Sequence, residues 1–245
     1  MDYLLPFLFL LIAFIYSSVG LGGGSSYTAL MAIFGISYQI IPTTSLTLNL
    51  IVTFIGMIHF WKNGHSRLNL IIPFLVTSIP MAYFAGSQEL PERIFNIFLL
   101  ITLIFVVIRI YLLNDLKISI QLTGIQKWIF IFSLGGVLGF IAGAVGIGGG
   151  IYLVPLIIMF GLGTEKEAAA SGAMFIWVNS LVGVIARSQT GTFDPQFILP
   201  LAIAVLIGGF GGSYLGAVKL DPKTIQKVMG SVIFIAIVFL IKGLL

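Results

Sequence analysis

Apolar segments long enough to cross a membrane make up most of this chain of 245 residues. A helix of about 20 apolar residues spans the roughly 30 Å hydrocarbon core of a bilayer. Charged residues are only 8% of the chain, so they could not cover the surface of a soluble globule of this size. We therefore predict an all-α polytopic membrane protein. The predicted spans are 3–19, 42–61, 68–85, 92–113, 127–145, 167–186, 197–218 and 224–244.

Two further apolar segments, 25–34 and 151–160, have ten residues each and end at a glycine. As helices they would be about 15 Å long, which is half the thickness of the hydrocarbon core. Each follows a cluster of glycines. We expect them to be half-helices, each preceded by a break in the chain. The segment 3–19 lacks the basic start and small-residue cleavage site of a secretory signal, so we expect it to be a retained helix.

The glycine clusters belong to an internal repeat. Residues 19–24 read VGLGGG and residues 145–150 read VGIGGG, so Gly146 lies 126 positions after Gly20. The same spacing, or one residue more, relates five other pairs: Gly35 and Gly161, Ser45 and Ser171, Gly56 and Gly183, Gly64 and Gly191, and Pro73 and Pro200. We predict a first transmembrane repeat over 1–115, a linker over 116–126 and a second transmembrane repeat over 127–245.

Each repeat then holds five helical segments, and an odd number would insert the second repeat upside down relative to the first. In that arrangement nine of the twelve Lys and Arg residues lie on one side of the membrane, which is a clear positive-inside bias. The alternative is that each glycine-broken pair crosses only once and the repeats are parallel, which divides the same residues seven against five. We favour inverted repeats with both termini outside.

The glycine breaks are the first candidate binding site. Backbone freed from helical hydrogen bonds is costly in lipid unless it lines a cavity or is buried in protein. The start of each half-helix offers unpaired N–H groups and the positive end of the helix dipole, which together suit an anion. The alternative is that the glycines only allow close helix packing. The candidate residues are Gly22, Gly23, Gly24, Ser25, Ser26, Gly148, Gly149 and Gly150.

Polar side chains inside the neighbouring spans could complete this site. Thr44, Ser45 and Asn49 lie at the start of the third segment, and Ser171 and Asn179 lie in the eighth. Ser45 and Asn49 are four residues apart, so they share one helix face. The alternative for each hydroxyl is a hydrogen bond to a carbonyl of its own helix. We expect these residues to supply hydroxyl and amide donors to a substrate.

Ionisable side chains lie almost entirely at the ends of the spans. No Asp or Glu falls within the middle of a span, which argues against cation transport through buried carboxylates. His59 is the only side chain near a span interior that could carry a coupled proton near neutral pH, although it could also be a residue of the membrane surface. We expect Arg109 and Arg187 to extend to the membrane surface, and Arg187 could instead attract an anion at the outer mouth.

Enzyme motifs and metal-binding clusters are absent from the sequence. It has two His residues, no Cys, no phosphate-binding loop and no nucleophile elbow. The twelve Lys and Arg residues are scattered singly, without the basic patch that nucleic-acid binding needs. We expect no enzymatic activity, no metal, no cofactor and no nucleic-acid partner.

The pattern resembles the sulfite exporter TauE/SafE-like family of membrane permeases. The resemblance rests on two glycine-rich segments, two pairs of glycines, five single residues and one basic loop. These are the segments 18–24 and 143–150, the pairs Gly35 with Gly161 and Gly64 with Gly191, residues Thr44, Ser45, Pro155, Ala170 and Ser171, and the loop 59–67. Ala170 replaces Thr44, and Ile151 and Tyr152 replace Ser25 and Ser26, so the two breaks are not chemically equivalent.

The resemblance implies secondary transport of a small sulfur-containing anion, such as sulfite, thiosulfate, sulfoacetate or a related organosulfonate, across an inner membrane. The expected partners are this anion and the lipid bilayer, and a homodimer stays open. Two other functions also stay open from the sequence: a passive channel for a small solute, and a membrane scaffold that transports nothing.

Overall fold

A computed structural model describes residues 4–18, 20–112, 124–189 and 193–216, together with single positions between 233 and 241. Within these residues it contains helices and no strand, which confirms the all-α class. The predicted linker and the last predicted span lie mostly outside the described residues. The helices are α1 (Leu4–Ser17), α2 (Gly24–Ile33), α3 (Ile41–Lys62), α4 (Leu68–Gly86), α5 (Glu92–Leu112), α6 (Gly124–Val145), α7 (Gly150–Met159), α8 (Glu165–Arg187) and α9 (Pro195–Gly216).

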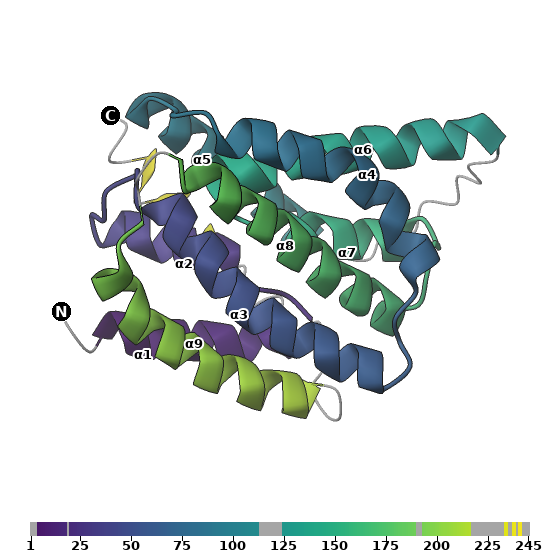
Figure 1. Cartoon of the computed structure of the whole chain (residues 1–245), viewed down its shortest axis with the longest axis horizontal. Coiled ribbons are helices and arrows are strands. Elements are labelled where there is room, and N and C mark those ends of the chain that lie inside the picture. Colours follow the sequence, from purple (N-terminus) through teal and green to yellow (C-terminus); the bar gives the residue numbers. More distant parts are fainter. Residues whose placement is uncertain are drawn as a thin grey trace.

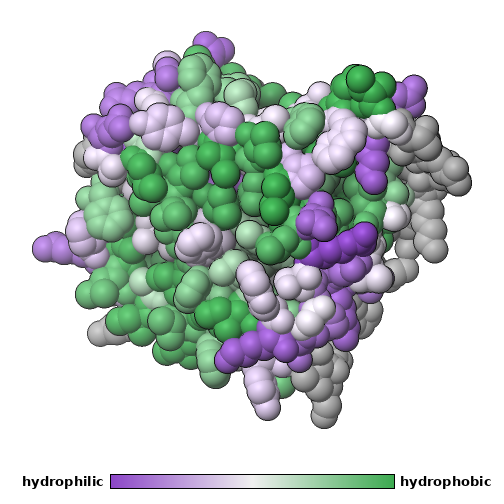
Figure 2. Space-filling model, turned by 45° about the vertical axis from the view of Figure 1, so that its right-hand side comes forward, coloured by the Kyte–Doolittle hydropathy of each residue, from purple (hydrophilic) through white to green (hydrophobic). Residues whose placement is uncertain are grey.

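The surface agrees with a multi-pass membrane protein. Among the described residues, the helices long and apolar enough to cross a bilayer are α3, α4, α6, α8 and most of α9. On α4 the exposed large residues Ile72, Val76, Ile79 and Tyr83 follow one another at helical spacing, so one stripe of the helix is free to face lipid. Figure 2 shows hydrophobic residues over much of one face, with hydrophilic residues gathered at its margins.

Helices α3 and α8 cross the centre of the molecule, with α1 and α9 on one side and α4 and α6 on the other (Figure 1). Gly20 packs against Phe60, near the end of α3, and against Ala169, near the start of α8. Gly183, near the end of α8, packs against Leu46, near the start of α3. The two central helices are therefore antiparallel.

The outer helix pairs join the two halves of the chain. A Cβ atom on Gly208 or Gly212 of α9 would overlap the carbonyl oxygen of Leu10 or Phe14 on α1. In the same way, Gly139 of α6 packs directly on the backbone of Ser78 on α4. Each outer pair thus joins one helix from each half of the chain. The inverted arrangement of the halves stays a prediction.

Both half-helices begin at a glycine in the left-handed conformation. Gly23 precedes α2 with φ of 86°, and Gly149 precedes α7 with φ of 75°. An L-residue with a side chain rarely adopts this conformation, so glycine is needed where the chain turns from the extended break into the helix. Each half-helix has ten residues, as expected.

We call the end of the molecule formed by the end of α3 and the start of α8 the basic end, because Lys62, Arg67 and Lys166 lie there. We call the other end, with the start of α3 and the end of α8, the opposite end. The positive-inside rule predicts that the basic end faces the cytoplasm.

Candidate functional site

The two glycine breaks meet beside α3, although about half the chain separates them in sequence. The hydroxyl of Ser45 donates to the carbonyl oxygen of Gly146 over 2.8 Å and lies 3.3 Å from the carbonyl oxygen of Gly24. A Cβ atom on Gly24 would lie only 2.7 Å from the carbonyl oxygen of Ile147. We call this contact between the breaks the junction, and Ser45 links both of its sides.

The side chain of Asn49 lies at the junction and touches both breaks. A Cβ atom on Gly22 would lie 2.5 Å from its Oδ1, and one on Gly24 would lie 2.5 Å from its Nδ2. From the second break, a Cβ atom on Gly148 would lie 3.0 Å from the same Nδ2. Side chains larger than hydrogen at these positions would displace the amide.

Asn49 is fully buried, and neither polar atom of its amide has a hydrogen-bond partner among the described residues. Leaving a buried polar group unpaired costs about 1–3 kcal/mol. Such a group calls for an explanation, and a binding site for a ligand is one. The amide can donate from Nδ2 and accept at Oδ1.

The half-helices add backbone donors at the same place. In the first turn of α2, the amides of Ser26 and Tyr27 donate to the carbonyl oxygen of Gly23. In the first turn of α7, the amide of Tyr152 donates to the carbonyl oxygen of Gly149. Within the described residues, the amides of Gly24 and Ser25 in α2, and of Gly150 and Ile151 in α7, find no acceptor. The positive ends of both helix dipoles therefore lie at the breaks, where they favour negative charge.

The hydroxyls of Ser25 and Ser26 are held by Tyr16. The Tyr16 hydroxyl lies 3.0 Å from Oγ of Ser25 and 2.6 Å from Oγ of Ser26, in a buried cluster. Tyr16 is a residue of the site that could not be recognised from the sequence motifs. Its only signal was a tyrosine one residue before the end of an otherwise apolar helix that leads into the break.

The remaining polar candidates differ in their distance from the junction. Thr44 is buried on α3 next to Ser45, and its hydroxyl has no partner among the described residues. Nδ2 of Asn179 donates to the carbonyl oxygen of Phe175 in its own helix over 2.8 Å. Ser171 lies near the basic end and lines a separate small cavity. No described contact joins Asn179 or Ser171 to the junction.

His59 also lies away from the junction. It is ten residues after Asn49 on α3, which is about 15 Å along the helix. Its Nδ1 lies 2.9 Å from Oγ of Ser213 on α9, and its ring meets Phe210 edge-on. The structure therefore places His59 in the contact between α3 and α9.

The expectation that Arg187 extends to the membrane surface is wrong. Its side chain is buried, and one terminal nitrogen donates to the carbonyl oxygens of Gly143 over 2.8 Å and Ala144 over 2.9 Å. These carbonyls belong to the last turn of α6, where the helix dipole is negative. Arg187 thus holds the end of α6 just before the second break. The side chain of Arg109 lies outside the described residues.

The two described cavities differ greatly in size. The cavity at the opposite end has a volume of about 350 Å³ and is lined by residues that include Tyr38, Pro42, Ala144 and Arg187. Pro42 packs against Gly146, so this cavity reaches the edge of the junction. The cavity at the basic end has only about 10 Å³, which is room for about one water molecule.

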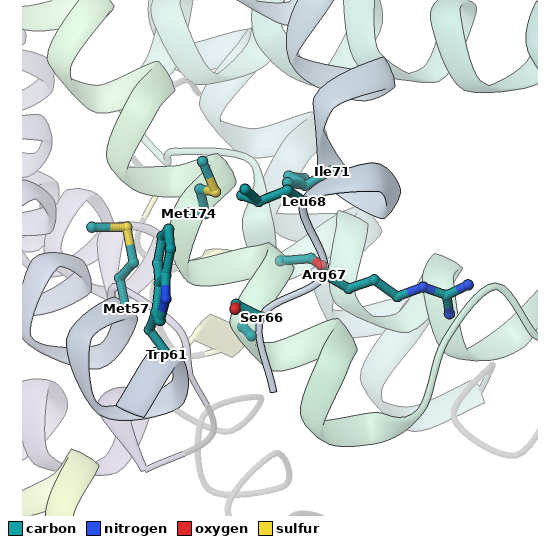
Figure 3. Close-up of a pocket in the computed structure, with 9 residues that line it drawn as sticks. Met57, Trp61, Ser66, Arg67, Leu68, Ile71 and Met174 are labelled. Atoms are coloured by element: carbon teal, nitrogen blue, oxygen red, sulfur yellow. The ribbon is translucent and has the colours of Figure 1, made fainter. Parts of the chain in front are cut away.

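Bulky side chains line the small cavity at the basic end. Met57, Trp61 and Met174 gather around the small cavity, while the side chain of Arg67 points away from it (Figure 3). Arg67 lies 3.7 Å from Glu167 at the start of α8, joining the loop before α4 to the second half. The junction is therefore closer to open space at the opposite end than at the basic end.

Comparisons with known proteins agree with this architecture. The family described as sulfite exporter TauE/SafE matches residues 5–240. The probable membrane transporter protein y4hK of Sinorhizobium fredii is 32% identical over 232 residues, covering 93% of each chain. The probable membrane transporter proteins YjnA of Bacillus subtilis and MJ0441 of Methanocaldococcus jannaschii are each 24% identical, with at least 89% of both chains covered. No solved structure matches. The chain is a multi-pass membrane protein that belongs to the sulfite exporter TauE/SafE family of membrane transporters.

Proposed function

We propose that this protein is a secondary transporter of a small sulfur-containing anion, which binds at the junction of the two glycine breaks. The observation that carries the proposal is Asn49, whose buried amide touches both breaks and has no partner among the described residues. A substrate that accepts a hydrogen bond from Nδ2 would remove the part of this cost that falls on the donor. The family description adds the class of substrate, since it names sulfite export.

The chemistry of the junction favours an anion. The free amides at the starts of α2 and α7 and the Nδ2 atom of Asn49 are all donors. They are also uncharged, and neutral donors bind an anion without the tight ion pair that would slow its release. Sulfite, thiosulfate, sulfoacetate and related organosulfonates fit this donor set because each presents several oxygens on one sulfur centre.

Alternating access would follow from movement of the two halves, for which we propose the limits 1–115 and 127–245. The breaks pack too closely at Gly24 and Ile147 to admit a substrate without separating. The cavity that reaches Pro42 offers a route from the opposite end, while the cavity lined by Met57, Trp61 and Met174 at the basic end is far smaller. Rocking of the halves about the left-handed glycines would open each route in turn.

Transport in liposomes tests this proposal. We expect purified protein to show saturable counterflow of sulfite, thiosulfate or sulfoacetate, which a passive channel would not produce. Asn49→Leu keeps the shape of the side chain but removes its amide, and we expect it to abolish counterflow. Asn179→Leu is the matched control, because Asn179 is equally buried and its Oδ1 also has no partner among the described residues, but its Nδ2 already donates within its own helix.

The proposal fails if Asn49→Leu transports as fast as the native protein. Flux that does not saturate and shows no counterflow would favour a channel. Native protein that neither moves nor binds any of these anions would favour a scaffold, in which the glycines serve only packing.

A further inference from the structure

The partner of Asn49 in the second half of the junction is Ile176. The spacing of 127 residues that relates Gly56 to Gly183 also relates Asn49 to Ile176. The packing agrees: Asn49 touches Gly22 and Gly24 in the first break, and Ile176 touches Gly148 and Gly150 in the second. The two side chains therefore occupy equivalent places with opposite chemistry.

Asn49 and Ile176 approach each other at Gly148. A Cβ atom on Gly148 would lie 2.7 Å from Cγ2 of Ile176 and 3.0 Å from Nδ2 of Asn49. Both side chains are buried, and they come from the two central helices. One wall of the junction is thus an amide and the other is hydrocarbon.

Other residues of the second half extend the apolar wall. Ile151 stands where the first half has Ser25, and it is buried. The hydroxyl of the next residue, Tyr152, donates to the carbonyl oxygen of Thr102 on α5 over 3.1 Å. Its hydroxyl is therefore bonded to α5, and among the described residues the side-chain donors found at the junction belong to the first half.

We infer that Ile176 determines specificity, and that the site prefers an anion carrying a short hydrocarbon group over an inorganic anion. This inference rests on the proposed function of the junction. An inorganic oxyanion gains nothing from Ile176: an oxygen placed against it loses water and finds no donor, and the lone-pair side of sulfite carries no hydrocarbon to bury there. A hydrocarbon group against Ile176 gains affinity instead, by about fourfold for each methylene that is buried.

Equilibrium binding to the purified protein tests this inference with three anions: sulfite, methanesulfonate and propane-1-sulfonate. We expect native affinity to rise along this series, with at least about a fourfold gain from methanesulfonate to propane-1-sulfonate. Ile176→Asn adds a second amide in a place that Asn49 shows to be large enough. It should tighten sulfite binding at least about tenfold and remove the preference for propane-1-sulfonate.

Two further variants keep the test decisive if Ile176→Asn does not fold. Ile176→Val removes one methylene and should weaken propane-1-sulfonate about fourfold without changing sulfite binding. Ile185→Val is the matched control, because Ile185 lies on the same helix but is exposed on the outer surface. It should change neither affinity.

The inference is overturned if the native protein binds all three anions equally or prefers sulfite. It is also overturned if the folded Ile176 variants keep the native ratio of affinities. Either result leaves the proposed function standing, because an anion still binds. Absence of binding by any of the three, with counterflow also absent, counts against the proposed function itself.

Discussion

Gly24→Ala tests the close contact at the junction with the smallest possible change. Gly24 is the first residue of α2 and its φ lies outside the left-handed region, so alanine can adopt its backbone conformation. All of the effect therefore comes from the added Cβ atom. That atom would lie 2.5 Å from Nδ2 of Asn49 and 2.7 Å from the carbonyl oxygen of Ile147, well inside ordinary contact distances.

Two magnitudes follow from these distances. Overpacking of a tightly packed site costs about 1–3 kcal/mol. The protein should therefore fold with a modestly lower stability. Displacing the amide of Asn49 would remove a hydrogen bond to a charged ligand, which contributes about 1.5–3 kcal/mol. Anion affinity should fall between about tenfold and 150-fold.

The assay pairs anion affinity with thermal unfolding in the same detergent. Gly56→Ala is the control, since Gly56 lies on α3 and a Cβ atom there would be 4.0 Å from its nearest neighbour, Cβ of Ala173. That variant should bind normally and unfold at the same temperature or higher. Native affinity in a folded Gly24→Ala protein would refute the placement of the substrate between the breaks.

Variants at three other residues test separate contacts of the structure. Arg187→Leu leaves two carbonyl oxygens at the end of α6 without this donor. We expect the free energy of unfolding to fall by about 1–3 kcal/mol for each carbonyl, and an unchanged unfolding midpoint would contradict this expectation. Thr164→Ala removes the capping box that begins α8 and should cost about 1 kcal/mol, whereas Thr164→Ser should restore it. If His59 carries a coupled proton, His59→Gln should remove the acceleration of uptake by an inward proton gradient. Unchanged acceleration would mean that His59 serves only the contact of α3 with Ser213 and Phe210 on α9.

Helix positions were the most predictable part of this protein. The predicted spans 42–61 and 68–85 correspond to α3 over Ile41–Lys62 and α4 over Leu68–Gly86. Membrane helices must be long, apolar and internally hydrogen-bonded, so their limits can be read from the order of residues alone. The left-handed glycines that start α2 and α7 were predictable for a similar reason, because clustered glycines end regular helix.

Side-chain partners were much less predictable. Ser25 and Ser26 were expected to face a substrate, but their hydroxyls bond to Tyr16 on α1. Arg187 stands at a helix end, where sequence alone suggests the membrane surface, yet its neighbours are the last carbonyls of α6. In both residues the outcome depends on which other helix lies opposite, and that information is spread over distant parts of the chain.

By itself, the sequence determined that this chain is a bundle of membrane helices with two glycine breaks at matching positions and almost no charge within the spans. Hydrophobic length, glycine spacing and the repeat are local or periodic properties, which do not depend on packing. Only the tertiary structure decided that the two breaks touch, that Asn49 lies between them without a described partner, and that Ile176 occupies the equivalent place. These facts arise from the antiparallel crossing of α3 and α8, which brings residues more than a hundred positions apart into contact.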